Sequence, residues 1–173
     1  MAYVNKRLKH MRPSLQLDLI NHPDIQVLSL FNEEREYCLL NIYNADNNAA
    51  LMHLSDCTDE LPNSVIYMGG DFNIHAYLWD PTYRGPEQPE HWDLLLETAE
   101  ELGLELSLPE NPGSSHIPGD RTKQETVIDL IFIPSQDVLN LKPKRLTANR
   151  GRPDHVPLLI IIPINPTPEF PQG

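Results

Sequence analysis

The chain has 173 residues, with 13 basic and 25 acidic side chains, 17 prolines and two cysteines. This length is typical of one domain with a sizeable core, and apolar runs that recur from end to end exclude general disorder. The longest run, at residues 156–164, is too short and too rich in proline to span a membrane. A net charge of −12 opposes non-specific wrapping of DNA.

Two cysteines without paired spacing indicate neither a disulfide framework nor a metal knuckle, and the basic N-terminus lacks an apolar signal core. We therefore predict an intracellular protein, nuclear or cytoplasmic, that is not secreted. Nine of the thirteen basic residues lie in two acid-free segments, at residues 6–12 and 142–152. Both read most simply as solvated loops, although a local basic rim near a site could hold phosphates.

The predicted elements form a strand-rich domain with few helices at residues 1–165, followed by a proline-rich tail at 166–173. In chain order we expect strands at residues 1–6, 25–31, 36–43, 64–68, 126–133, 144–147 and 156–164. The second and third strands form a hairpin around a charged turn, and Gly69-Gly70 stops the fourth. Helices are expected at residues 49–54 and 90–102, the latter with one apolar face. A polar loop at residues 109–124 follows the second helix.

Three acidic residues flank or interrupt apolar strands, where a carboxylate is costly unless it is paired, hydrogen-bonded or bound to a cation. Asp71 follows a strand across two glycines, and Asp129 lies inside an apolar strand. Asp154 opens the last strand beside His155. Any one of them is more often a turn residue or a helix cap. Together they predict one shared polar pocket at a sheet edge.

The partners that would stabilise Asp129 most economically are a histidine and a divalent metal, because acids outnumber bases in this chain. A pocket built from three carboxylates is rich in oxygen ligands. Such a pocket suits Mg²⁺ or Mn²⁺ better than Zn²⁺.

Gly70-Asp71-Phe72-Asn73, Ile128-Asp129 within an apolar strand, and Asp154-His155 occur in this order. The ordered set resembles the endonuclease/exonuclease/phosphatase superfamily, which shares the fold of pancreatic deoxyribonuclease and exonuclease III. Residues 69–75 with Leu78-Trp79-Asp80 resemble more narrowly the endonuclease domains of non-LTR retrotransposons, particularly fungal ones. The resemblance implies an α/β (α+β) fold of two sheets, a four-layer α-β-β-α sandwich of the DNase-like type.

The resemblance also implies divalent-metal-dependent hydrolysis of phosphodiester bonds in DNA. Asp71 would position or deprotonate the attacking water, and Asn73 would hold that water and a phosphate oxygen. His155 would contact the scissile phosphate, while Asp129 fixes its tautomer and stabilises its cation.

The same resemblance gives Tyr43 the role of donating its hydroxyl to phosphate, alongside Asn73 and His155. Asp154 and Asp71 would bind the metal, which would be Mg²⁺ or alternatively Mn²⁺. Such an ion acts as a Lewis acid on the phosphoryl oxygen and on the leaving 3′ oxygen.

The sequence departs from the family pattern at its N-terminus. Family members begin with a strand–helix unit that supplies an active-site Asn and then a metal-binding Glu, and this chain has no equivalent of either. Glu33, Glu34 and Glu36 lie in the predicted hairpin turn and are poor substitutes. The chain therefore resembles a domain that lacks its first strand–helix unit, with a weakly held metal and impaired activity.

Three functions follow: a nuclease domain of retrotransposon origin, a catalytically inactive remnant that acts as a binding module, and a phosphatase of the same superfamily. The loop at residues 75–80 favours the nuclease lineage over the phosphatase. A missing first strand would leave one sheet edge unprotected, which predicts self-association through that edge.

Overall fold

Six strands form the larger of two β-sheets in the computed structural model, which describes residues 5–45, 47–149 and 154–164. Their order across the sheet is β1-β2-β3-β4-β6-β5. The strands are β1 (Ser14–Leu15), β2 (Ile25–Phe31), β3 (Glu36–Tyr43), β4 (Val65–Asp71), β5 (Leu104–Leu106) and β6 (Asp129–Pro134). The second sheet pairs β7 (Lys144–Arg145) with β8 (Leu158–Leu159).

The predicted hairpin of β2 and β3 is confirmed, in an antiparallel register that runs from Ile25 opposite Ile42 to Phe31 opposite Glu36. Its turn is closed by Asn32, whose Oδ1 accepts hydrogen bonds from the backbone N–H groups of Glu34 at 3.0 Å and Arg35 at 2.7 Å. Such a side-chain bond to nearby backbone is how asparagine stabilises turns. The local sequence therefore fixes both the turn and the register of these two strands.

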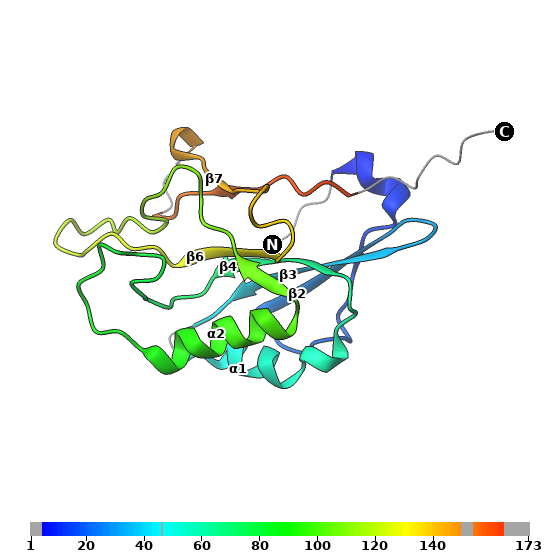
Figure 1. Ribbon diagram of the computed structural model, residues 1–173, viewed down its shortest axis with the longest axis horizontal. Coiled ribbons are helices and arrows are strands. Elements are labelled where there is room, and N and C mark those ends of the chain that lie inside the picture. Colours follow the sequence, from blue (N-terminus) through cyan, green and yellow to red (C-terminus); the bar gives the residue numbers. More distant parts are fainter. Residues whose placement is uncertain (1–4, 46, 150–153, 165–173) are drawn as a thin grey trace.

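Both α-helices cover the same face of the large sheet (Figure 1). Helix α1 (Ala49–Asp56) crosses between β3 and β4, which allows these two strands to run parallel. Helix α2 (Pro89–Glu101) buries Leu95 and Ala99 in the main core. In the described part of the chain no helix combines the length and the apolar character needed to cross a membrane.

The small β7–β8 sheet lies on the opposite face of the large sheet (Figure 1). Ile131 and Ile133 of β6 form a second core there with Val138. Leu158 and Ile160, which follow the site residues Asp154 and His155 in sequence, pack against this core and anchor the end of the described chain. The prediction of a two-sheet α/β fold is confirmed. Three short 3₁₀ helices complete the described elements: η1 (Lys6–Met11), η2 (Thr58–Glu60) and η3 (Thr147–Asn149).

Several predicted boundaries are wrong. Lys6 begins the helix η1, capped by Asn5, rather than ending a strand, and residues 1–4 lie outside the described ranges, as does the tail at 166–173. The strand that we expected to stop at Gly69 continues to Asp71. Its two glycines therefore lie inside the strand and do not end it.

The predicted strands at residues 126–133 and 156–164 are shorter than expected. Asp129 begins β6 instead of interrupting it. Of residues 156–164 only Leu158–Leu159 form a strand, because the flanking prolines at positions 157 and 163 have no N–H to donate to a ladder. The sequence pattern also missed β1 and β5, which are only two and three residues long.

Candidate active site

Asp71, the last residue of β4, lies between the neighbouring strands β3 and β6. Its partner on the parallel strand β3 is Tyr43, and its partner on the antiparallel strand β6 is Asp129. Gly70 makes this approach possible, because it has a φ of 150° and a Cβ there would overlap the carbonyl oxygen of Ile42. The sheet register alone therefore places two carboxylates and a tyrosine at one end of the strands.

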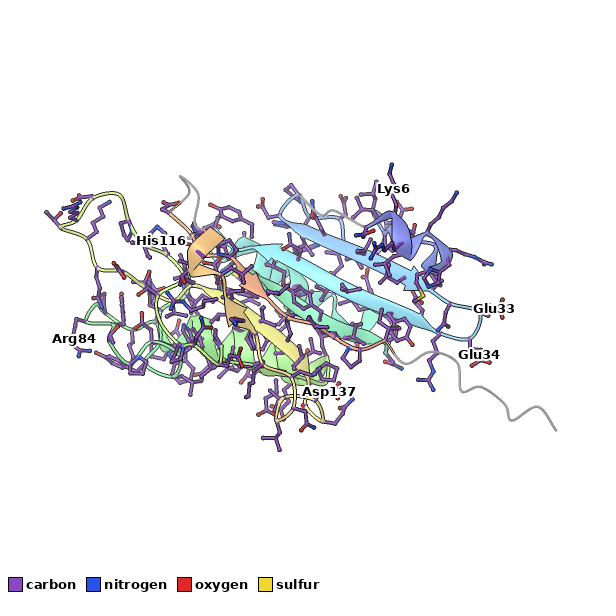
Figure 2. The ribbon with its side chains drawn as sticks, turned by 90° about the horizontal axis from the view of Figure 1, so that it is seen from above. Lys6, Glu33, Glu34, Arg84, His116 and Asp137 are labelled. Carbon is purple, nitrogen blue, oxygen red and sulfur yellow. The ribbon has the colours of Figure 1, made fainter. Side chains whose placement is uncertain are left out.

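Backbone pairing with the polar loop brings Asp154 and His155 to the same place. His116 forms isolated bridges with both Thr126 and His155. The N–H of Ile117 also donates to the carbonyl of Asp154 at 2.6 Å. Figure 2 places His116 at the opposite end of the molecule from Glu33 and Glu34, so these two glutamates of the hairpin turn lie far from the site.

The imidazole of His155 lies among three carboxylates. Its Nδ1 is 2.8 Å from Asp129 Oδ2, which makes Asp129 the acceptor of a hydrogen bond from Nδ1–H. Its Nε2 lies 3.9 Å from Asp71 Oδ2 and 3.9 Å from Asp154 Oδ1. Of the two partners considered for Asp129, the structure shows the histidine. Because Asp129 holds Nδ1–H, the other ring nitrogen points to the remaining carboxylates.

These contacts shift the ionisation of the site in opposite directions. Partial burial disfavours the imidazolium, but the hydrogen bond from His155 to Asp129 and the charges of Asp129, Asp71 and Asp154 outweigh it and raise the pKa of His155. Burial, and then the charge of Asp129, raise the pKa of Asp71. The pKa of Asp154 is lowered, chiefly by a hydrogen bond from its own backbone N–H.

Asn73 follows in a left-handed conformation, with a φ of 51°. Its backbone N–H donates to Asp71 Oδ1 at 3.1 Å, and its Nδ2 donates to the carbonyl of Asn44 at 2.8 Å. The side chain of Asn44 is buried and in turn bonds the carbonyl of Phe72 and the N–H of Leu51. Asn44 thus positions Asn73, although we did not single it out; a polar residue directly after an apolar strand was the available signal.

Two residues of the polar loop also belong to the site without having been predicted. Ser115 is 1% exposed, and its Oγ accepts hydrogen bonds from the N–H groups of Ile128 and Asp129 at 3.0 and 2.9 Å. His116 Nε2 lies 3.3 Å from Asp154 Oδ2. No ligand spacing marks either residue in the sequence, since the long loop brings them in through backbone pairing.

Two groups of side chains have potential metal-ligand atoms within 4.8 Å of one another. One is Asp71, Asp129 and His155, and the other is His116, Asp154 and His155. The two predicted metal ligands, Asp71 and Asp154, therefore fall in different groups that share His155. Neither of these two groups, which were found among the described residues, contains a glutamate. Tyr43, the predicted phosphate contact, is 52% exposed beside the first group.

A protein family described as endonuclease–reverse transcriptase matches residues 37–159. The chain belongs to this family. The matched region contains Asp71, Asn73, Asp129, Asp154 and His155. A comparison with curated proteins finds no match.

Solved endonuclease structures share the fold. The endonuclease domain of TRAS1, a telomere-specific non-LTR retrotransposon, superimposes with a TM-score of 0.65 at 17% identity, covering 90% of this chain and 71% of that one. The AP endonuclease LMAP from Leishmania major gives a TM-score of 0.60 at 14% identity, covering 79% of this chain and 54% of that one. The family match and these folds confirm the expected membership of the endonuclease/exonuclease/phosphatase superfamily.

Proposed function

We propose that this chain is a divalent-metal-dependent nuclease domain of retrotransposon origin, which hydrolyses phosphodiester bonds in DNA inside the cell, in the nucleus or cytoplasm. The observation that carries the proposal is the imidazole of His155 held between Asp129 and Asp71, three residues from separate segments of the chain. A histidine and two carboxylates at one sheet edge suit water activation and phosphate binding. Membership of an endonuclease family supports the same chemistry.

Asp71 is the proposed base that positions and deprotonates the attacking water. Its raised pKa brings the carboxylate closer to the range in which proton transfer is efficient. Asn73 is proposed to hold the water and a phosphate oxygen: one hydrogen of its Nδ2 is bound to Asn44, the second can donate to the phosphate oxygen, and its Oδ1 can accept from the water. The left-handed backbone of Asn73 returns its N–H to Asp71, which keeps the two side chains together.

His155 is the proposed contact to the scissile phosphate. Its raised pKa favours the cation, and a cationic imidazole can donate from Nε2 to a phosphate oxygen while Asp129 holds Nδ1–H. Tyr43 is proposed to donate its exposed hydroxyl to the same phosphate, because it is the cross-strand partner of Asp71. These groups stabilise negative charge on the phosphate without a covalent intermediate.

The carboxylates fit a hard divalent cation. Asp71 lies in an oxygen-rich group, and the half-exposed Asp154 approaches the same imidazole nitrogen, Nε2 of His155, at 3.9 Å, so these two would hold Mg²⁺ or Mn²⁺. Bound there, the ion supplies Lewis-acid stabilisation of the phosphoryl and leaving oxygens. Because neither metal-binding group of the described chain includes a glutamate, we propose that the ion is held weakly and that cleavage is slow.

Nicking of supercoiled plasmid by the purified chain in Mg²⁺ tests this function. We expect slow nicking that EDTA stops and that Asp71→Ala and His155→Ala abolish. Asp59→Ala is the matched control, because Asp59 is exposed on η2 outside both groups. Nicking that survives Asp71→Ala, or that needs no divalent ion, would refute the proposal.

The absence of a glutamate from both metal-binding groups of the described chain also favours the second candidate, a catalytically inactive domain that binds DNA. Fluorescence anisotropy with a labelled duplex separates the two functions. Binding that Asp71→Ala leaves intact, together with no Mg²⁺-dependent nicking, would identify a binding module.

We also propose that the chain self-associates through the outer edge of β2. The edge strand β1 pairs with β2 only at Ser29 and Leu28, and the N–H of Gln16 adds one bond to the carbonyl of Val27. Leu17, which follows β1, is 70% exposed. An uncovered strand edge is a template for pairing with another chain. Sedimentation velocity at rising concentration should show a dimer that Leu17→Lys weakens, and a monomer at all concentrations would contradict this.

A further inference from the structure

The second group, His116, Asp154 and His155, contains a histidine for which the proposed hydrolysis has no use. His116 comes from the polar loop, and its Nε2 faces Asp154 Oδ2 at 3.3 Å. The same carboxylate approaches His155 Nε2 with its other oxygen, Oδ1, at 3.9 Å. The two imidazole rings are 5.0 Å apart between centroids. Two imidazole nitrogens and one carboxylate therefore have ligand atoms within 4.8 Å of one another.

The spacing of these atoms matches the coordination of a small transition ion. Zinc binds histidine nitrogen and carboxylate oxygen at about 2.0–2.2 Å, so neighbouring ligands of a tetrahedral site lie roughly 3.3–3.6 Å apart. The two separations to Asp154, 3.3 Å from His116 to Oδ2 and 3.9 Å from His155 to Oδ1, and the limit of 4.8 Å between any two of the three ligand atoms are brought into this range by side-chain movements of about 1 Å. The side chains of His116, His155 and Asp154 are 25%, 34% and 54% exposed, which leaves a path for an ion and room for a further ligand.

The surroundings orient the ring of His155 and fix the backbone of His116. Asp129 accepts from Nδ1–H of His155, which leaves Nε2 as the nitrogen that can bind a metal. A carboxylate behind a ligating histidine is the usual support of zinc sites. The backbone of His116 is fixed on both sides, by reciprocal bonds with Thr126 at 2.9 and 3.0 Å and by its bridge to His155. The fold thus holds the ring of His155 and the backbone of His116 before any ion arrives.

We propose that His116 Nε2, His155 Nε2 and the carboxylate of Asp154 form a binding site for one divalent transition ion of the zinc type. Imidazole ligands favour Zn²⁺ and Co²⁺, whereas Mg²⁺ prefers oxygen. The site therefore differs in metal preference from the oxygen-rich group around Asp71, with which it shares His155, and it also contains Asp154, a ligand of the proposed Mg²⁺ site.

A consequence for activity rests on the proposed function. His155 Nε2 cannot donate to a phosphate oxygen while it is a metal ligand. Occupation of the site by Zn²⁺ therefore opposes Mg²⁺-dependent cleavage. His116 makes this inhibition possible, because it is a ligand of the zinc-type group and not of the group around Asp71.

Titration of the full chain with Co²⁺ in the absence of DNA and Mg²⁺ tests the site through the visible absorption of the bound ion. We expect one equivalent to bind to the natural chain, and Zn²⁺ to displace it. His116→Gln should remove that equivalent, and Asp129→Asn should weaken it by about tenfold because it loses the carboxylate behind His155. His10→Gln, which replaces an exposed histidine outside both groups, should bind as the natural chain does.

Circular dichroism checks that His116→Gln stays folded, as expected because its pairing uses only backbone atoms. Unchanged Co²⁺ affinity in His116→Gln, or no bound equivalent in the natural chain, would overturn the site. In the nicking assay, micromolar Zn²⁺ should inhibit the natural chain at least about tenfold more strongly than His116→Gln. If no nicking occurs at all, the proposed function fails while the Co²⁺ titration still decides the metal site.

Discussion

Replacing Asp129 with asparagine isolates the charge that holds His155 in place. Asparagine keeps an oxygen at the position that accepts from Nδ1–H, so the hydrogen bond of 2.8 Å can survive in neutral form. The variant loses only the negative charge. We therefore expect the pKa of His155 to fall relative to the natural chain, because the charge of Asp129 is among the causes that raise it.

The energetic loss can be worked from the contact. A hydrogen bond to a charged group contributes about 1.5–3 kcal/mol and a neutral one about 0.5–1.5 kcal/mol, so the charge contributes about 1 kcal/mol. The side chains of His155 and Asp129 are 34% and 21% exposed, and solvent screening reduces this contribution toward about 0.5 kcal/mol. The free energy of unfolding of the natural chain should exceed that of the variant by this amount only at pH values where His155 is protonated.

The sign of the pH dependence follows from the direction of the shift. The folded-state pKa of His155 lies above its ordinary value of 6.5, so its contribution to stability is complete below that pH and is lost as pH rises through the folded value. At higher pH the imidazolium charge is gone, and the repulsion between Asp129 and Asp71, which the variant relieves, opposes the remaining hydrogen bond from the neutral ring to Asp129. The stability difference should therefore shrink to zero or reverse in alkaline solution.

Two measurements check this reasoning. Histidine ring resonances followed by NMR should show a lower pKa for His155 in Asp129→Asn, with His10, outside the site, as the internal reference. Denaturant unfolding at about pH 5.5 and about pH 9 should show a deficit of about 0.5–1 kcal/mol at the lower pH only. An unchanged pKa of His155, or an equal deficit at both pH values, would refute the assigned role of Asp129.

Three further substitutions test the framework of the site. Asp71→Asn removes a carboxylate whose ionised form is disfavoured by burial and by the neighbouring carboxylate, so we expect the melting temperature at neutral pH to rise by about 1–3 °C while nicking is lost. Ser115→Ala removes the acceptor of two backbone N–H groups and should cost about 2 kcal/mol, or about 4–8 °C, whereas Ser114→Ala beside it serves as the control. Gly70→Ala forces a side chain against the backbone of β3 at a φ of 150° and should cost about 1–3 kcal/mol, while Gly119→Ala, where a Cβ meets open space, should be nearly neutral.

Thermal melts at several pH values read out all three substitutions. The folded-state pKa of Asp71 is raised above 3.8, so the gain from Asp71→Asn should be lost as pH falls below that value. A gain that is independent of pH would contradict the ionic explanation. If Ser114→Ala lowered the melting temperature as much as Ser115→Ala, and Gly119→Ala as much as Gly70→Ala, the two framework residues would act through general packing rather than through the contacts described.

The elements that could be predicted from sequence are those with local signals. In the hairpin of β2 and β3, buried residues largely alternate with partly buried or exposed ones around an asparagine turn, and α2 has one apolar face. The run at residues 156–164 carries a strand composition but few strand contacts, because its prolines cannot donate. The two-residue β1 depends on its pairing with β2, which no local pattern encodes.

The site residues also divide into those with a local sequence signal and those that depend on tertiary pairing. Asp71, Asp129 and His155 could be picked out because apolar strands do not tolerate an unpaired carboxylate and because their order resembles a known family. His116 could not, since its place beside His155 depends on bridges between a loop and a segment distant in sequence. A histidine in a polar loop carries no signal of its own until tertiary structure brings a second ligand near it.

The two groups that could hold a metal share His155, so an ion that occupies its Nε2 would determine what the proposed site can do. In the oxygen-rich group the carboxylate of Asp71 can hold a hard ion while the imidazole remains available to phosphate. In the other group the imidazole itself becomes a ligand, with His116 as its partner. Asp129 orients His155 identically in both states, so it cannot discriminate between them. His116 is therefore the residue through which this chain would acquire sensitivity to zinc-type ions, independently of the chemistry of the proposed cleavage.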